Sequence, residues 1–432
     1  MEESGAFAEP LLDAVLSQDD LTNIHDRRLL TQIVYGTLRM RGHLDWIIHT
    51  LYRGNFDLME MGIKNILRTA MFQMWYTDRI PDFAIVDEAV EITKIKHPAG
   101  SGLVNAILRN AIRGKDKITY PDVEQDPELH ISTVYSHPLW LVKRWKEIFG
   151  TDETIAICKA NNEIPPYCLR VNRLKISRER AVEELSREGF DVKTTSFSPD
   201  GIIISTAALH LQETISYKSG HIQVQDEASQ LISYLVDPKP GDAVLDICAG
   251  IGGKTTHLAE IMGNRGSIMA IDMNENKIKL LKGNIRRQEI TIVDAQVRDA
   301  TKDLGRIFHE AFDRILIDAP CSGLGTLRRN PEIKWRTSKE SLKKVVLLQR
   351  SILKRAALYL KKGGVLVYST CSILPEENEK IIKSFIADNR DFTLLRPTGM
   401  IPSSMIDNRG YFRTYPHRYG TDGFFGAALK KL

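Results

Sequence analysis

Apolar residues recur at three- and four-residue spacing through residues 1–138. The stretches RRLLTQIVYGTLRMRGHLDWIIHTLY, MGIKNILRTAMFQMWY, AIVDEAVEITKIK and GLVNAILRNAIR all show it, and strand-like alternation is absent from them. Such spacing places the apolar side chains on one face of a helix. The pattern therefore predicts an all-α bundle for this first region.

The pattern changes after the break NNEIPPY. A strand (YCLRVNRLK) is followed by a helix (SRERAVEELSREGF), and the run SPDGIIIST then has the turn and the β-branched residues of a second strand. We expect a small α/β connector domain over residues 139–238.

Residues 239–432 alternate short apolar runs with helical stretches. The runs are AVLDICA, GSIMAID, AQVRDA, RILIDAP and GGVLVYST, and the tail GYFRTYPHRYGTDGFFGAALKKL predicts a turn followed by a closing strand. This rhythm is typical of a parallel, doubly wound sheet. In such a sheet, ligands bind at the carboxyl edge of the strands.

The composition is that of an ordinary globular protein, with 43% hydrophobic and 26% charged residues in a chain of 432. No run approaches the ~18 uncharged apolar residues of a membrane span, and the start MEESGAFAEPLL is acidic, which argues against a secretory signal. Five cysteines without a CxxC pair indicate neither a disulfide framework nor a zinc site. We expect a cytoplasmic protein without a metal.

Positive charge is concentrated in the third region. Residues 241–432 carry 32 Lys and Arg against 21 Asp and Glu, a net of +11, whereas residues 1–140 carry 14 against 20, a net of −6. Lysine and arginine neutralise phosphates and release counterions, so this segment favours a polyanionic partner. A solvated basic surface explains the charge equally well.

The stretch LDICAGIGGKTTHLAE has the form of a strand, a glycine-rich turn and the start of a helix. It does not match the phosphate loop of nucleotide triphosphatases, because Cys248 stands where that motif needs its first glycine. It does not match the dinucleotide fingerprint either, because Thr255 stands in place of the third glycine. The small residues of this turn instead favour a ligand other than a phosphate that approaches the backbone closely.

Acidic residues mark four successive strand ends. For each one alone, a helix N-cap is an equally good explanation. Together they predict a nucleoside pocket, with Asp272 where an acid binds ribose hydroxyls. Their charge is unsuited to phosphates and suited to a cationic ligand such as the sulfonium of S-adenosylmethionine. The four acids are Asp246, Asp272, Asp299 and Asp318.

Two cysteines, Cys321 and Cys371, directly follow predicted strands, so we expect both at strand ends beside Asp318. A cysteine attacks C6 of a pyrimidine only as a thiolate. The attack makes C5 electron-rich enough to take a methyl group, after which a base must remove the C5 proton. The layout suits this chemistry, but the residues alone do not rank the two cysteines. We interpret Cys158, Cys168 and Cys248 as small apolar fillers.

At these residues the chain resembles a known family. The motifs DAPCSGLGTLRRNPEIKW, YSTCSILPEEN and DICAGIGGKTTHLA are similar to those of RNA cytosine-C5 methyltransferases, and DRRLLTQIVYGTLRMRGHLDWII resembles the NusB-like RNA-binding domain. The combination resembles the RsmB (Sun/Fmu) type, which acts on 16S rRNA. The resemblance implies a Rossmann-like class I S-adenosylmethionine-dependent methyltransferase domain, preceded by an all-α NusB-like domain and the α/β connector.

The resemblance also implies roles for single residues. Cys371 would be the nucleophile, Cys321 would assist release of the product, and Asp318 would lie nearest the reacting methyl group. Asp272 would hold the ribose and Asp299 the adenine side. The cofactor loop would comprise Cys248, Ala249, Gly250, Ile251, Gly252, Gly253 and Lys254.

Downstream of Cys321, the chain has four candidate RNA contacts: Arg328, Arg329, Lys334 and Trp335. The tryptophan would act by stacking on a base. Because the NusB-like region is net acidic, two interpretations of it stay open: RNA binding, and docking on the catalytic domain.

We therefore expect a monomeric enzyme that methylates C5 of a cytosine in 16S rRNA with S-adenosylmethionine, through a covalent adduct between a cysteine and C6. Two alternatives stay open. One is the same chemistry on tRNA or 23S rRNA. The other is a non-catalytic RNA-binding or ribosome assembly factor built on this fold.

Overall fold

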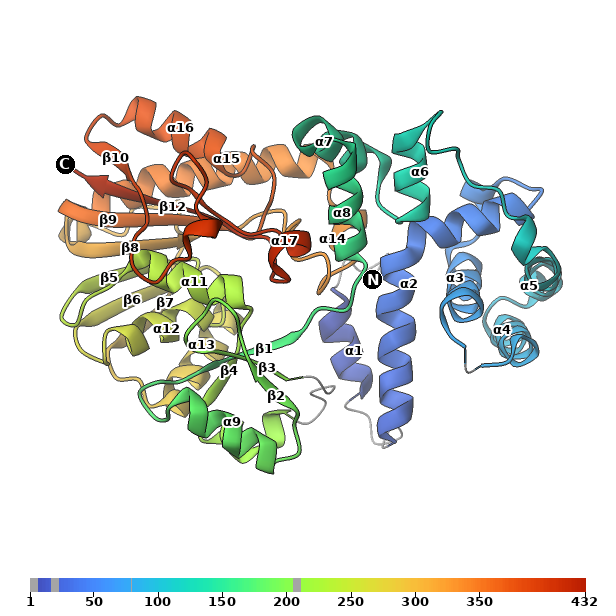
Figure 1. Cartoon of the computed structure of the whole chain (residues 1–432), viewed down its shortest axis with the longest axis horizontal. Helices are drawn as coiled ribbons and strands as arrows, with labels where there is room; N and C mark the ends of the chain where they lie inside the picture. Colours follow the sequence, from blue (N-terminus) through green and yellow to red (C-terminus); the bar gives the residue numbers. More distant parts are fainter. Residues whose placement is uncertain (1–6, 17–22, 79, 205–210) are drawn as a thin grey trace. The chain divides into compact units, whose positions relative to one another are not determined.

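The computed structural model describes residues 7–16, 23–78, 80–204 and 211–432, and the chain divides into two compact units (Figure 1). Unit 1 consists of Met1–Glu163 together with Leu327–Arg336, and unit 2 of Ile164–Thr326 together with Thr337–Leu432. The chain thus leaves unit 1, returns to it for one short segment, and then completes unit 2. In the part of the chain that the structure describes, no helix is both long and apolar enough to cross a bilayer.

Unit 1 is built from helices, as the apolar spacing predicts. Local capping fixes two of their starts: the side chain of Asn23 accepts a hydrogen bond from the backbone of His25, and that of Asp126 accepts one from Leu129. The helices are α1 (Ala8–Leu16), α2 (Ile24–Leu51), η1 (Phe56–Leu58), α3 (Met61–Tyr76), α4 (Asp82–Lys96), η2 (Pro98–Gly100), α5 (Ser101–Gly114), η3 (Lys115–Lys117), α6 (Pro127–Val134), α7 (Leu139–Phe149), α8 (Thr151–Asn161) and α14 (Ile333–Arg336).

One apolar core joins α2, α3, α4 and α5. Leu44 and Ile47 of α2, Leu67 and Met71 of α3, and Leu108 of α5 are all fully buried in it. Their spacing of three or four residues within each helix puts them on one face. Burial of each such side chain stabilises the fold by about 1.5–3 kcal/mol. The predicted bundle is therefore the bundle that forms.

The helical unit extends past the predicted domain boundary at residue 138. Helix α7 packs against α6 and α8. Its Leu141, Val142 and Trp145 are fully buried, and the Trp145 ring lies 5.6 Å from the ring of His137, centroid to centroid. The apolar face of α7 is thus buried among helices of the same unit. In the structure, α7 and α8 therefore pack within unit 1, and the domain boundary at residue 138 stays a prediction.

Unit 2 begins with the connector, a four-stranded antiparallel sheet in the order β2-β3-β1-β4. Leu169 pairs with Ile202 in its centre, and both are buried against Ala181 and Leu185 of α9. The predicted strand, helix and strand are confirmed, although the end of the last predicted run, at 205 and 206, lies outside the described residues. The elements are β1 (Tyr167–Val171), α9 (Arg178–Arg187), β2 (Val192–Thr194), β3 (Gly201–Ile204), η4 (Leu211–Glu213), α10 (Ile215–Lys218) and β4 (Ile222–Val224).

The second sheet of unit 2 has the order β10-β12-β9-β8-β5-β6-β7, and β11 pairs with β12 at its side. All five strands predicted from apolar runs form, and they are parallel to one another. The sheet is not purely parallel, because the closing strand β12 runs antiparallel to both of its neighbours, β9 and β10. The strands are β5 (Ala243–Ile247), β6 (Ser267–Asp272), β7 (Val293–Val297), β8 (Phe312–Asp318), β9 (Leu360–Thr370), β10 (Phe392–Leu395), β11 (Phe412–Arg413) and β12 (Phe425–Lys431).

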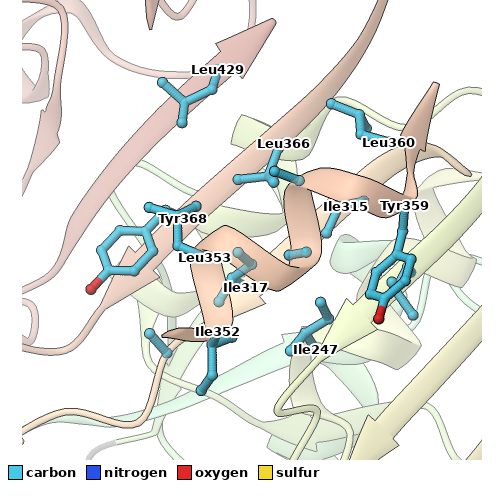
Figure 2. Packing of buried hydrophobic residues seen from close by; sticks show 14 of the residues in the cluster. Ile247, Ile315, Ile317, Ile352, Leu353, Tyr359, Leu360, Leu366, Tyr368 and Leu429 are labelled. Atoms are coloured by element: carbon cyan, nitrogen blue, oxygen red, sulfur yellow. The ribbon is translucent and has the colours of Figure 1, made fainter. Parts of the chain in front are cut away.

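Helices cover both faces of this sheet. Alternate residues of β8 point to opposite cores: Ile315 and Ile317 pack with Ile352 and Leu353 of α15, as Figure 2 shows, whereas Leu316 packs into the core that contains α11 and α12. A parallel sheet buried on both faces explains the continuous apolar runs. The remaining elements are α11 (Glu227–Val236), α12 (Gly253–Ile261), α13 (Glu275–Gln288), η5 (Arg306–Phe308), α15 (Lys339–Ala356), η6 (Ala357–Tyr359), α16 (Glu379–Asp388), η7 (Ser403–Met405) and α17 (Pro416–Tyr419).

Candidate active site

The predicted cofactor loop lies at the carboxyl edge of the sheet, between β5 and α12. Cys248, Gly250 and Gly252 have φ of +63°, +60° and +86°. The backbone N–H of Gly250 donates to Asp272 Oδ2 at 3.0 Å, so the loop is held against the end of β6. A Cβ added at Gly250 would meet no atom within 4 Å, whereas one added at Gly252 would collide with the Leu281 side chain. The loop is therefore tightly packed at Gly252 and open at Gly250.

Two of the four predicted acids end their strands at this edge. Asp272 is the last residue of β6, and its carboxylate accepts hydrogen bonds from the backbones of Gly250 and Asn274, which leaves acceptor positions on both oxygens. Asp318 is the last residue of β8 and accepts from Ser369 Oγ at 3.0 Å and from Lys254 Nζ at 2.7 Å. The ammonium group of Lys254 also lies 5.1 Å from the centre of the Phe424 ring.

The other two acids are placed differently. Asp246 lies inside β5 and is fully buried; it accepts from Thr255 Oγ1 at 2.6 Å, and burial raises its pKa to about 7. It therefore supports the start of α12 from within, whereas Asp272 and Asp318 end their strands at the edge. Asp299 follows β7 and accepts from the hydroxyl and the backbone N–H of Thr301, bonds that lower its pKa.

None of these acids is the N-cap of α12 or α13, the helices that follow the first two strands. The N-cap residues there are Gly252 and Asn274. The N-cap explanation that the sequence left open therefore does not account for Asp246 or Asp272.

The two predicted cysteines meet at the same edge. Because β8 and β9 are parallel and Asp318 pairs with Ser369, the turns that follow them emerge side by side. The Sγ atoms of Cys321 and Cys371 lie 3.1 Å apart, and the N–H of Gly325 donates to the carbonyl of Cys371 at 2.9 Å. The hydrogen bond to Cys371, together with burial, raises the pKa of Cys321 well above its usual value. Cys321 therefore keeps its proton more firmly than an ordinary cysteine.

The other three cysteines do not take part in this pair. Cys158 and Cys168 are buried, and burial raises the pKa of Cys158 to about 12. Cys248 lies in the cofactor loop, where burial and the neighbouring acids raise its pKa to about 12. Within the described residues, no group of three or more His, Cys, Asp or Glu side chains could hold a metal ion.

The candidate RNA contacts lie in unit 1, in the segment Leu327–Arg336. Lys334 is 1% exposed, and its ammonium group donates to the carbonyl of Arg39 at 2.8 Å. Trp335 donates its indole N–H to the carbonyl of Leu38 at 2.7 Å, and Arg328 is 3% exposed. Buried cations of this kind are satisfied by protein groups and do not face solvent. The structure thus assigns Lys334 and Arg328 to the interior of unit 1, in contrast to the prediction of RNA contact; Arg329 is partly exposed.

Two buried charged residues near the site carried no prediction. Arg170 of β1 donates to the carbonyl of Gly253 in the cofactor loop, and to Thr256 and Glu260 of α12 at 2.8 and 2.6 Å. Glu377 lies between Cys371 and α16 and is fully buried. Two features of the sequence could have indicated these residues: an arginine inside the apolar strand YCLRV, and a run of acids directly after the second cysteine motif.

Family comparisons match the three regions in order. A model described as NusB family matches residues 1–113, a model for the ferredoxin-like domain of RsmF/B-like methyltransferases matches residues 137–209, and a model described as 16S rRNA methyltransferase RsmB/F matches residues 233–430.

Curated relatives match along the whole chain. A probable ribosomal RNA small subunit methyltransferase B from Bacillus subtilis is 35% identical, over 100% of this chain and 96% of the relative. A ribosomal RNA small subunit methyltransferase B from Yersinia enterocolitica is 34% identical, over 94% of this chain and 91% of the relative.

Solved structures share the fold. The crystal structure of PH0851 has a TM-score of 0.82 at 32% identity and covers 97% of this chain and 93% of its own. A methyltransferase homolog protein from Pyrococcus horikoshii has a TM-score of 0.61 at 33% identity, over 71% of this chain and 99% of its own. NSun6 from the same organism, solved with SFG, has a TM-score of 0.61 at 27% identity, over 68% of this chain and 98% of its own. These likenesses confirm the predicted fold class.

Proposed function

Because the chain belongs to the 16S rRNA methyltransferase RsmB/F family, we propose that it methylates C5 of a cytosine in 16S rRNA through a covalent bond between Cys371 and C6. The observation that carries the proposal is the contact of two cysteine sulfurs, 3.1 Å apart, at the edge of the sheet that also presents Asp318 and the cofactor loop. Two thiols in contact, of which one holds its proton firmly, supply a nucleophile and a separate acid–base group.

The cofactor is S-adenosylmethionine, as predicted, in agreement with the family. It supplies an electrophilic methyl group when bound. The residues of this chain fit it: the backbone of the loop is open at Gly250, and Asp272 keeps free acceptor positions for ribose hydroxyls. Ile251 and Met273 flank these groups and are 47% and 75% exposed, so apolar surface is available for a purine ring. We assign Asp272 to the ribose and Asp299 to the adenine side.

Cys371 attacks first in this scheme. When one of two contacting thiols ionises, the remaining S–H donates a hydrogen bond to the thiolate and stabilises it. We assign the thiolate to Cys371, as the family motifs imply, and the remaining S–H to Cys321, whose sulfur lies 3.1 Å away. The Cys371 sulfur then bonds to C6 of the cytosine, and the electron density that this places on C5 accepts the methyl group.

Cys321 acts in the second half of the reaction. Once Cys371 is bonded to carbon, its sulfur no longer forms the thiol–thiolate hydrogen bond with Cys321, so the largest cause of the raised pKa of Cys321 is removed. Cys321 can then release its proton to solvent and, as a thiolate, take the proton from C5. The electron pair of the C5–H bond reforms the ring double bond, and the pair of the Cys371–C6 bond returns to Cys371.

The choice of 16S rRNA rests on the names of the curated relatives. Bisulfite sequencing of total rRNA and tRNA from a strain lacking the gene, complemented with the wild type or with Cys371→Ser, tests it. We expect one 16S rRNA cytosine to lose its protection in the deletion strain and to regain it only with the wild type. If a cytosine of tRNA or 23S rRNA instead loses its protection from bisulfite conversion, that RNA is the substrate. An unchanged bisulfite profile would reject the cytosine-C5 reaction.

A further inference from the structure

Glu377 is a fully buried carboxylate that the reaction above does not use. It lies in the turn that connects Cys371 to α16. Its oxygens accept hydrogen bonds from Ser322 twice, from the backbone N–H at 2.7 Å and from the hydroxyl at 2.6 Å, and also from the hydroxyl of Ser372. All three donated bonds come from residues adjacent to the two cysteines, since Ser322 follows Cys321 and Ser372 follows Cys371.

A second side chain adds to this arrangement. Gln349 of α15 is fully buried, and its amide donates to Glu377 Oε1 at 3.2 Å and to the carbonyl of Pro320 at 2.9 Å. Pro320 directly precedes Cys321. The carboxylate of Glu377 and the amide of Gln349 therefore bind the residues directly after and directly before Cys321, namely Ser322 and Pro320.

A buried carboxylate costs free energy unless hydrogen bonds replace its hydration. Here each oxygen accepts two bonds, and bonds to a charged acceptor are shorter and stronger than neutral ones. Such bonds fix both geometry and separation. The two serines reach one acceptor only when their turns lie close together, which is also the condition for contact between the cysteine sulfurs.

We propose that Glu377 is a positioning residue that holds the Cys321 and Cys371 turns in register, so that the two sulfurs stay in contact through the catalytic cycle. This inference rests on the proposed two-cysteine reaction. It predicts that a change at Glu377 disturbs the separation of the two sulfurs and the turnover of the adduct, and leaves cofactor binding intact, because none of the bonds of the Glu377 side chain reaches the cofactor loop.

Disulfide formation reports the sulfur separation without any methylation. Treatment with diamide joins Cys321 and Cys371: each thiol loses one proton and one electron, an S–S bond forms, and the N=N bond of diamide is reduced to a hydrazine. Quenching at timed intervals and peptide mapping by mass spectrometry gives the rate. The variants are Glu377→Gln and Glu377→Asp in the full chain, and the matched control is Glu376→Gln, whose carboxylate is paired with Lys380.

In Glu377→Gln we expect this rate to fall by about 10-fold or more and kcat for methyl transfer to fall by up to about 100-fold, since a displacement of about 1 Å costs that much. The KM for S-adenosylmethionine should stay within about 2-fold, and Glu377→Asp should recover part of both losses. The control should match the wild type. An unchanged disulfide rate and unchanged kcat in Glu377→Gln would overturn the inference.

Failure of the proposed function gives a different result. If the wild type methylates no cytosine but the disulfide rate still depends on Glu377, the two-cysteine reaction is wrong and the positioning role stands. If Glu377→Gln does not fold, Ser322→Ala and Ser372→Ala carry the test, since each removes a hydroxyl that donates to the carboxylate. Both should slow disulfide formation, and wild-type rates in both would reject the inference.

Discussion

At the scale of single residues, the structure adds the contact between Cys321 and Cys371, which the sequence does not show. The motifs place both cysteines at strand ends, and nothing in their spacing ranks one above the other. In the structure, the hydrogen bond to Cys371 and burial raise the pKa of Cys321, which agrees with the proposed assignment of Cys371 as the nucleophile. Such an effect depends on a distance of 3.1 Å across two turns, which is set by the register of β8 and β9. Sequence patterns do not record that distance.

This ranking gives opposite phenotypes for the two cysteines. Cys371→Ser should show no detectable methylation and no covalent RNA complex, because an alcohol is far less ionised than a thiol. Cys321→Ala should still form the adduct and fail to release it, so a covalent protein–RNA band should accumulate on a denaturing gel when cofactor is present. Cys158→Ala, which alters a buried cysteine of α8 outside both the pair and the cofactor loop, serves as the control and should leave no trapped band. A trapped band in Cys371→Ser and none in Cys321→Ala would reverse the roles.

At the scale of elements, the apolar runs predict every parallel strand of the catalytic sheet, because burial on both faces makes such strands continuous in sequence. They do not tell which acids face a ligand. Asp272 and Asp318 end their strands and lie at the edge, whereas Asp246 is one residue from the end of β5 and points into a sheet face. A shift of one residue along a strand turns a side chain to a different environment. The sequence also does not predict the contact that Arg170 makes between the connector and the cofactor loop, because the partners of Arg170 are distant in sequence.

Arg170 should be costly to remove. Its guanidinium is fully buried and pairs with Glu260 at 2.6 Å. In Arg170→Met, Glu260 loses its cation partner inside the protein, so we expect unit 2 to lose about 3–5 kcal/mol of stability in urea unfolding. The double variant Arg170→Met with Glu260→Gln should recover part of this loss. Arg180→Met is the control, since Arg180 is an exposed residue of α9. A loss no larger than that of the control would contradict the structural role.

At the scale of the whole molecule, the segment Leu327–Arg336 changes how charge is distributed. The sequence divides the protein into consecutive regions, but this segment belongs to the helical unit. Unit 1 consequently carries 22 Lys and Arg against 25 Asp and Glu, a net of −3, and unit 2 carries 37 against 30, a net of +7. From its local sequence alone, a cluster of charged residues such as LRRNPEIKW is typical of a solvated surface. Its burial depends on Leu38, Arg39 and Asn162, which lie far away in the chain.

If the charge of Lys334 is satisfied within unit 1, Lys334→Met should leave the salt dependence of RNA binding unchanged. A lysine that contacts a phosphate of single-stranded RNA contributes about 0.7 to the slope of log K against log salt. We expect the slope for a 16S rRNA fragment, measured by fluorescence anisotropy at several salt concentrations, to match that of the wild type. Lys143→Met removes the same charge from an exposed position of α7 and controls for net charge. A slope lower by about 0.7 in Lys334→Met alone would restore Lys334 as an RNA contact.

The return of Leu327–Arg336 to the helical unit also bears on how the protein is made. On the ribosome, domains generally fold from the N-terminus onward as they emerge, at about 5–20 residues per second. Here the first unit to emerge lacks its last segment until Arg336 has left the exit tunnel, well after Glu163. At that pace the helical bundle waits roughly 10–35 s for the segment that carries Lys334 and Trp335. The first unit to be synthesised is therefore completed only when most of the second has been translated.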